Sequence, residues 1–181
     1  MAAMKAEVSE LTQFEASPAE YPPVEGVTDD LLATCWQRIE HFISHRFGSR
    51  AVVWTLTSEG GEWRPPLGPI LAVTEAFQWC DGDWQSYTIT RGPLGLLLPP
   101  GHVQIDASVG TVSLELPASV ETAVQRLAAY LEAESVLPAG VRSYRANVGQ
   151  LSESISADPA HIAKAIHNSG AADLLRKYRR A

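Results

Sequence analysis

Two segments of this chain carry apolar residues at helical spacing, and a section patterned for strands separates them. The first predicted helix runs from about Thr28 to Phe47, with Thr28 as a suitable N-cap and Gly48 as a stop. Its apolar stripe consists of Leu32, Cys35, Trp36, Ile39, Phe42 and Ile43. The second runs from about Pro117 to Glu134, and its stripe consists of Val120, Val124, Leu127, Ala128 and Leu131. Alanines in the second helix allow close packing on another helix.

The section between these helices favours strands. Residues 51–57 are β-branched and alternate, residues 70–79 and 84–90 read as further strands, and Asp81-Gly82 is a strong hairpin signal. We therefore expect an α+β fold, mainly α. It would be a small helical bundle with a β-rich insertion between the two main helices, an extended N-terminal arm and a C-terminal docking segment.

The composition of the chain and the positions of its prolines and glycines suggest how it divides into segments. Residues 1–27 contain Pro18, Pro22 and Pro23, many glutamates and little apolar periodicity, which is typical of an arm. Residues 28–137 would form the core, made of helix, β-rich insertion and helix. Residues 138–181 would hold an extended segment and docking helices.

Charge and cysteine usage exclude several classes of function. A formal net charge of −7 does not favour bulk attraction to nucleic acid or to an anionic membrane. Cys35 and Cys80 are far apart and form no C-x-x-C pair, so the pattern supports neither a redox motif nor a zinc site. No apolar run approaches the roughly 20 residues of a membrane span. These features predict a soluble protein that is made in the cytoplasm and has reduced thiols.

The motifs of catalysis are missing from the sequence. His41 and His45 are four residues apart but lack the glutamate of an H-E-x-x-H motif, and Asp81 and Asp83 suit a turn better than a pair of catalytic carboxylates. No nucleophile elbow or phosphate-binding glycine pattern occurs. We therefore expect no catalytic residue, cofactor or metal site. A small enzyme or ligand-binding domain with an unrecognised site stays as an alternative.

The C-terminal end is the most unusual part of this acidic chain. It gathers four cations beside an apolar pair: Leu174, Leu175, Arg176, Lys177, Arg179 and Arg180. One interpretation is a segment that docks on another surface. The other is a solvated helix end whose cations suit the helix dipole.

The order of these elements resembles the head–tail connector proteins, also called adaptor or head-completion proteins, of tailed bacteriophages and gene transfer agents. The resemblance extends from about Asp29 to the C-terminus. It rests on the Leu67-Gly68-Pro69-Ile70 connector, the Gly149-to-Ser154 segment and the Leu174-to-Arg180 ending.

The resemblance implies a ring, typically of twelve subunits, beneath the portal in the neck of a phage or gene-transfer-agent particle that assembles in the bacterial cytoplasm. Such a ring joins the portal to a stopper or tail protein and continues a channel through which DNA passes as non-specific cargo. The alternative neck components, a stopper or a tail terminator, would be smaller and mostly β, and the two long helices argue against them.

The resemblance also assigns roles to residues. Leu174, Leu175 and Tyr178 would be buried anchors on the partner. The cations Arg176, Arg179 and Arg180 would pair with acids of the portal or a neighbouring subunit. Packing within or between subunits would involve Trp36, Ile39, Phe42, Val124, Leu127 and Leu131.

Overall fold

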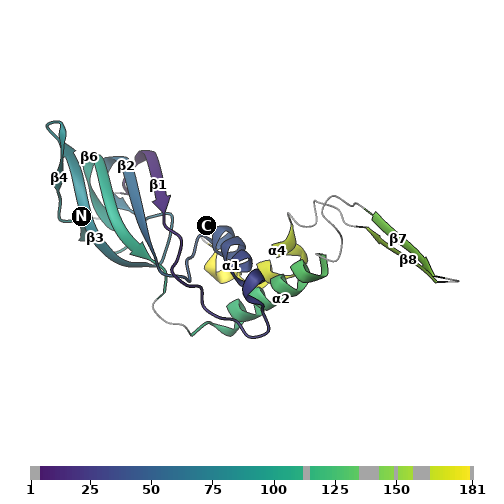
Figure 1. The fold of residues 1–181 in the computed structure, drawn as a ribbon. Helices are drawn as coiled ribbons and strands as arrows, with labels where there is room; N and C mark the ends of the chain where they lie inside the picture. Colours follow the sequence, from purple (N-terminus) through teal and green to yellow (C-terminus); the bar gives the residue numbers. More distant parts are fainter. Residues whose placement is uncertain (1–4, 112–114, 135–142, 149–150, 157–163, 180–181) are drawn as a thin grey trace. The chain divides into compact units, whose positions relative to one another are not determined.

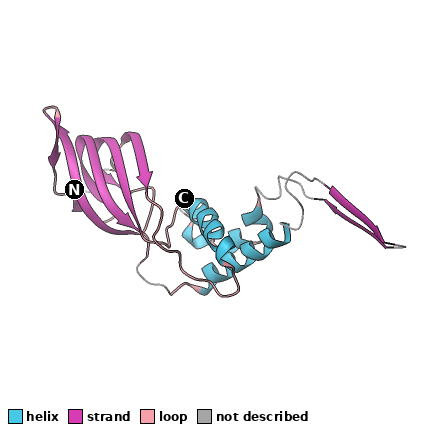
Figure 2. Ribbon diagram, viewed as in Figure 1, coloured by secondary structure: helices cyan, strands magenta, loops and turns pink. Residues whose placement is uncertain are grey.

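The chain forms two compact units, each made of two separate stretches of sequence. The computed structural model describes residues 5–111, 115–134, 143–148, 151–156 and 164–179. The sheet unit comprises Met1–Pro22 and Ser44–Leu114, and the helical unit comprises Pro23–Ile43 and Glu115–Ala181. All of the described helices belong to the helical unit (Figure 2).

The sheet unit is built around one antiparallel sheet of six strands (Figure 1). The strand order is β1-β2-β6-β3-β4, and β5 pairs with β6. The strands are β1 (Val8–Glu15), β2 (Arg50–Trp63), β3 (Ile70–Cys80), β4 (Asp83–Ser86), β5 (Thr90–Arg91) and β6 (Leu96–Val109). The two 14-residue strands β2 and β6 pair along their whole length, from Arg50 opposite Val109 to Trp63 opposite Leu96.

Alternation along these strands creates the core of the sheet unit. On β2 the side chains of Val52, Trp54 and Leu56 are buried while the residues between them are half-buried. Since successive side chains of a strand point to opposite faces, one face of the sheet becomes apolar and the other meets water. The inner face of β6 completes this core with Val103, Ile105, Ala107 and Val109.

Two glycines bend β2 so that a second tryptophan reaches the same core. Trp54 and Trp63 are an odd number of positions apart, yet their rings meet edge to face at 5.6 Å. Between them, Gly60 and Gly61 have φ angles of 89° and 117°, which L side chains rarely adopt. The change in side-chain direction takes place across this pair.

A buried ion cluster ties β1 to the segment 46–50 within the sheet unit. Arg46 donates to both carboxylate oxygens of Glu15, at 2.5 and 2.9 Å, and Arg50 donates to the same carboxylate at 3.0 Å. The Arg46 and Arg50 side chains are 4% and 5% exposed, and that of Glu15 is 18% exposed. Burial by itself would raise the pKa of Glu15, but the two guanidinium groups outweigh it and hold that pKa below its ordinary value.

The helical unit contains two long helices, α1 (Asp29–Ile43) and α2 (Ala118–Glu134). The short helical turns α4 (Ala165–Asn168), α5 (Ala171–Leu174) and η1 (Arg176–Tyr178) follow, and α1, α4 and α5 all contact α2. The strands β7 (Ser143–Val148) and β8 (Leu151–Ser156) pair with each other as a separate antiparallel sheet.

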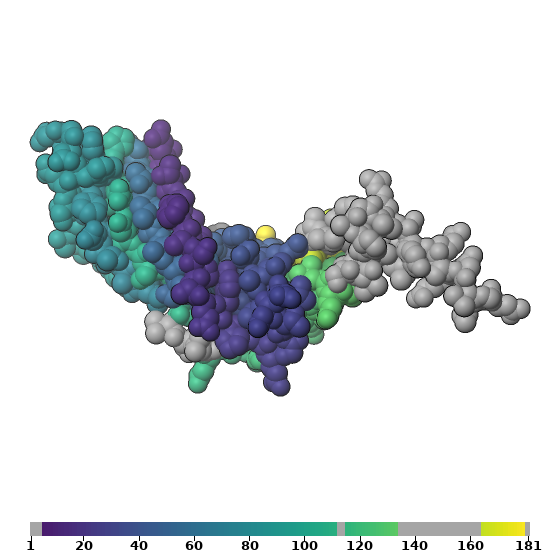
Figure 3. Space-filling model, in the orientation of Figure 1, coloured from purple at the N-terminus to yellow at the C-terminus, as the bar shows by residue number. Residues whose placement is uncertain are grey.

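The expected mainly-α bundle with a β insertion is wrong. The six-stranded sheet dominates the fold, and α1 and α2 are the only substantial helices in the described residues. Residues 8–15, expected in an extended arm, form the edge strand β1, which lies on the surface of the sheet unit in purple in Figure 3. An edge strand has one side open to water, so β1 can be polar and still pair with β2. The polar composition of residues 8–15 is therefore why the sequence did not predict a strand there.

Candidate functional site

The C-terminal segment combines a buried leucine with exposed cations. Leu175 is fully buried, and its neighbour Leu174 is half-buried. Gly170, with φ of 74°, separates α4 from α5. Ala171 is also buried, so α5 is held in the helical unit by small and apolar side chains.

The described cations of this segment lie at the surface of the helical unit. Arg176, Lys177 and Arg179 are exposed. Arg176 pairs with Asp173 at 2.9 Å, but both side chains are more than 70% exposed, so this pair adds about 0–1 kcal/mol. Tyr178 is half-buried, and Arg180 lies outside the described residues. The segment thus presents a positive surface, and its buried residues Ala171 and Leu175 pack in the helical unit.

A pocket of about 310 Å³ lies beside these cations. It is lined by Phe42, His167, Gly170, Ala172, Asp173, Arg176 and Arg179. The rings of Phe42 and His167 meet edge to face at 5.3 Å, and the Arg179 guanidinium lies 5.1 Å from the centre of the Phe42 ring. This arrangement can receive an acidic or apolar side chain of a partner, and it holds no nucleophile beside a general base.

The residues expected in packing lie in the helical unit. Trp36, Ile39, Val124 and Leu127 are fully buried there, and Phe42 and Leu131 are half-buried. Their role between subunits stays a prediction.

The two histidines that the sequence places four residues apart do not share one helix face in the structure. His41 is exposed on α1, whereas His45 follows the end of that helix and its ring packs on Phe47 at 4.6 Å. Across the described ranges, no group of three or more histidine, cysteine or carboxylate side chains is placed to hold a metal ion. Among the same residues, no helix has the length and apolar character of a membrane span.

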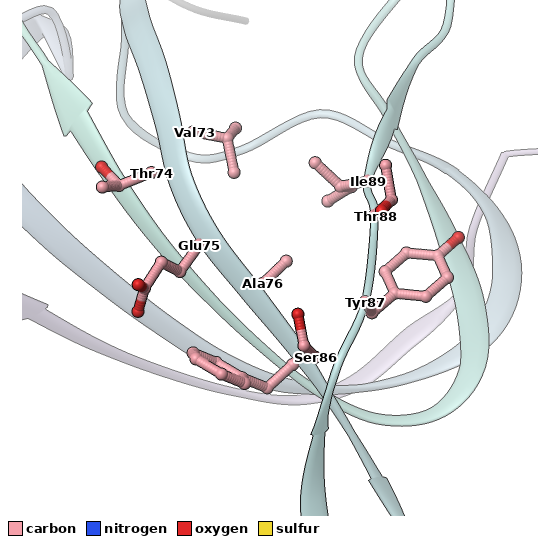
Figure 4. A pocket seen from close by; sticks show the side chains of 9 residues that line it. Val73, Thr74, Glu75, Ala76, Ser86, Tyr87, Thr88 and Ile89 are labelled. Atoms are coloured by element: carbon pink, nitrogen blue, oxygen red, sulfur yellow. The ribbon is translucent and has the colours of Figure 1, made fainter.

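A second pocket, of about 340 Å³, opens between β3 and residues 86–89. Val73 and Ile89 point toward one another across it, and Glu75 and Tyr87 belong to its two sides (Figure 4). Among the residues that line it, Glu75 is the one carboxylate and Tyr87 the one other titratable side chain, and no histidine, lysine or cysteine belongs to the lining.

The solvent-facing side of the sheet carries residues that the sequence did not single out. One row crosses four strands: Phe14 lies opposite Val53, Val53 opposite Asp106, and Asp106 opposite Glu75. We call this row, together with its neighbour Phe77, the outer sheet face. These residues become neighbours through the register of the paired strands, and a single sequence does not reveal that register.

The two cysteines differ in accessibility, and this difference predicts their reactivity. Cys35 is fully buried on α1, and burial raises its pKa to about 11, whereas Cys80 is half-buried at the end of β3. Since the thiolate is the nucleophile, a thiol reagent at pH 8 should label Cys80 in the folded protein and Cys35 only after unfolding. Mass spectrometry of labelled peptides measures this. Equal labelling of both in the folded protein would contradict the burial of Cys35.

Comparison with known proteins gives a fold but no family. No protein-family model matches the sequence, and no curated protein matches it. The fold is similar to a chain from the neck of a native gene transfer agent particle computed with C12 symmetry, with a TM-score of 0.58 and 21% identity over 96% of each chain. It is also similar to a chain from the neck of an empty gene transfer agent particle computed with C6 symmetry. That match has a TM-score of 0.54 and 21% identity over 84% of this chain and 76% of the other.

Proposed function

We propose that this protein is a structural subunit of the neck of a gene-transfer-agent or phage-like particle, and more specifically its head–tail connector. The observation that carries the proposal is the fold, which is similar to that of a neck protein over nearly the whole chain. Twelve copies would form a ring beneath the portal, link it to the stopper or tail, and continue the DNA channel. The C12 symmetry used for the similar neck supports that copy number. The subunit would assemble in the bacterial cytoplasm and act without catalysis.

The C-terminal segment would be its partner-docking surface. The exposed cations Arg176 and Arg179, together with Arg180, would pair with acids of the portal or a neighbouring subunit. Leu174 and Tyr178 are half-buried and could add apolar contact. Since Leu175 is already buried in the helical unit, its contribution would be to hold the segment in place.

Binding to purified heads tests this function. The protein should bind heads that contain the portal but no neck or tail proteins, and cryo-electron microscopy should show a twelve-fold ring at the portal vertex. Heads assembled without the portal are the control and should bind none. A folded protein that binds neither kind of head, or both equally, would contradict the connector role.

A stopper is the second candidate, because the dominant sheet weakens the argument that two long helices exclude a mostly β neck component. The same experiment separates the two. A stopper should bind only heads that already carry a connector ring, whereas a connector should bind the bare portal vertex.

A further inference from the structure

The outer sheet face carries two carboxylates in an unfavourable arrangement. Glu75 and Asp106 lie directly opposite each other in the pairing of β3 with β6. Like charges in such positions destabilise a sheet. In the described part of the chain neither carboxylate is paired with a cation, and Asp106 accepts only a neutral hydrogen bond from Gln104 at 3.1 Å. A cation from another molecule would relieve this repulsion.

The same face also exposes an aromatic ring. Phe14 is 71% exposed and belongs to the row that contains Val53, Asp106 and Glu75. Phe77, from β3, lies half-buried opposite Gln104 in the neighbouring row. Carboxylates flanked by apolar rings suit a partner surface that combines cations with apolar side chains.

This chain itself carries a surface of that kind. The C-terminal segment exposes Arg176, Lys177 and Arg179 beside the half-buried Leu174 and Tyr178. It also contains four of the fourteen Lys and Arg residues of the protein within five positions, Arg176 to Arg180. The outer sheet face and the C-terminal segment are therefore complementary in charge and in apolar character.

We propose that the outer sheet face of one copy binds the C-terminal cationic segment of the next copy. Two different surfaces of the same chain then meet, which is a heterologous contact, and such a contact forms a ring when the rotation from copy to copy divides a full turn evenly. The proposal rests on the ring function above and names the neighbouring subunit, rather than the portal, as the partner of the C-terminal cations.

Charge reversal with rescue tests this contact. One variant carries Glu75→Lys and Asp106→Lys, and a second carries Arg176→Glu and Arg179→Glu. Each alone would place like charges on both sides of the contact and should weaken association between copies at least tenfold. An equimolar mixture of the two variants, or one chain with all four substitutions, restores opposite charges and should recover association. The matched control, Arg64→Glu with Arg91→Glu, changes exposed cations of the sheet unit outside both surfaces and should have little effect.

Association is measured by sedimentation equilibrium in solution and by the number of copies per portal-bearing head, with circular dichroism to verify folding. The proposal would be overturned if each variant folds and associates more weakly than the wild type, but the mixture or the chain with all four substitutions does not recover association. If the cationic-segment variant binds heads poorly but self-associates normally, the segment docks on the portal and the proposal is also overturned. Rescue in solution without any binding to heads supports this contact and contradicts the connector function. If the wild-type protein is monomeric in solution and also forms no ring on portal-bearing heads, both this contact and the connector function are contradicted.

Discussion

Replacing Glu15 with alanine should lower the free energy of unfolding by about 3–5 kcal/mol. The substitution leaves the nearly buried guanidinium groups of Arg46 and Arg50 without the carboxylate that both of them bind. Arg50 keeps its hydrogen bond to the Gly48 carbonyl, but removing the carboxylate from a buried ion pair still carries a large penalty, whereas a surface pair contributes little. Urea denaturation of both proteins measures the difference.

Glu10→Ala is a matched control, because it removes an exposed glutamate from the same strand. It should change the stability by less than about 0.5 kcal/mol. If Glu15→Ala were equally mild, the ion cluster would not hold β1 in the sheet.

The same carboxylate makes stability depend on pH in the acid range. Because the pKa of Glu15 is lower in the folded protein than its ordinary value of 4.5, its stabilising contribution is fully present above that value. The contribution is lost as the pH falls through the lower, folded pKa. The wild-type protein should therefore lose more stability than Glu15→Ala as the pH falls below 4.5, and thermal melts over that range would show it.

Replacing Trp54 with alanine should also cost about 3–5 kcal/mol. Trp54 is fully buried, packs edge to face on Trp63, and donates its indole N–H to Gln13 at 2.9 Å. Its loss leaves a cavity at the centre of the sheet unit and removes a bond between β2 and β1. Chemical denaturation followed by circular dichroism, which does not depend on the lost fluorophore, measures the change.

Trp79→Ala provides the control for residue type. Trp79 is 42% exposed and packs on Trp84 at the far edge of the sheet. Its replacement should cost about 1 kcal/mol, within the range of an aromatic pair at a partly exposed site. Similar losses for both variants would mean that Trp54 is not central to the core.

Local sequence signals placed several elements correctly. The apolar stripe and its alanines located α2 at Ala118–Glu134, close to the expected Pro117–Glu134. The first helix was also found, although it ends at Ile43 rather than Phe47, because Ser44 adopts a left-handed φ of 55°. The hairpin signal at Asp81-Gly82 is confirmed as the two-residue turn between β3 and β4, where both residues have positive φ. Caps, stripes and turns depend on neighbours in sequence.

Of the two candidate surfaces, only the cationic C-terminal segment could be predicted from the sequence. The cationic C-terminal run could be read directly, since its residues are consecutive. The structure was needed to show that Leu175 is buried while the adjacent Leu174 is only half-buried, because helical phase and packing on α2 decide between neighbours. The outer sheet face could not be anticipated, because Phe14, Glu75 and Asp106 come from three different strands.

The sequence by itself determined the two long helices, the hairpin at Asp81-Gly82 and a positive C-terminal end on an acidic chain. The tertiary structure alone decided that a sheet dominates, that β1 belongs to it, and that Glu15 binds arginines 31 and 35 residues away. The physical reason is the range of the interactions. A helix closes its hydrogen bonds within four residues, whereas a sheet depends on a register between distant segments, and a shift of one residue would exchange its buried and exposed faces.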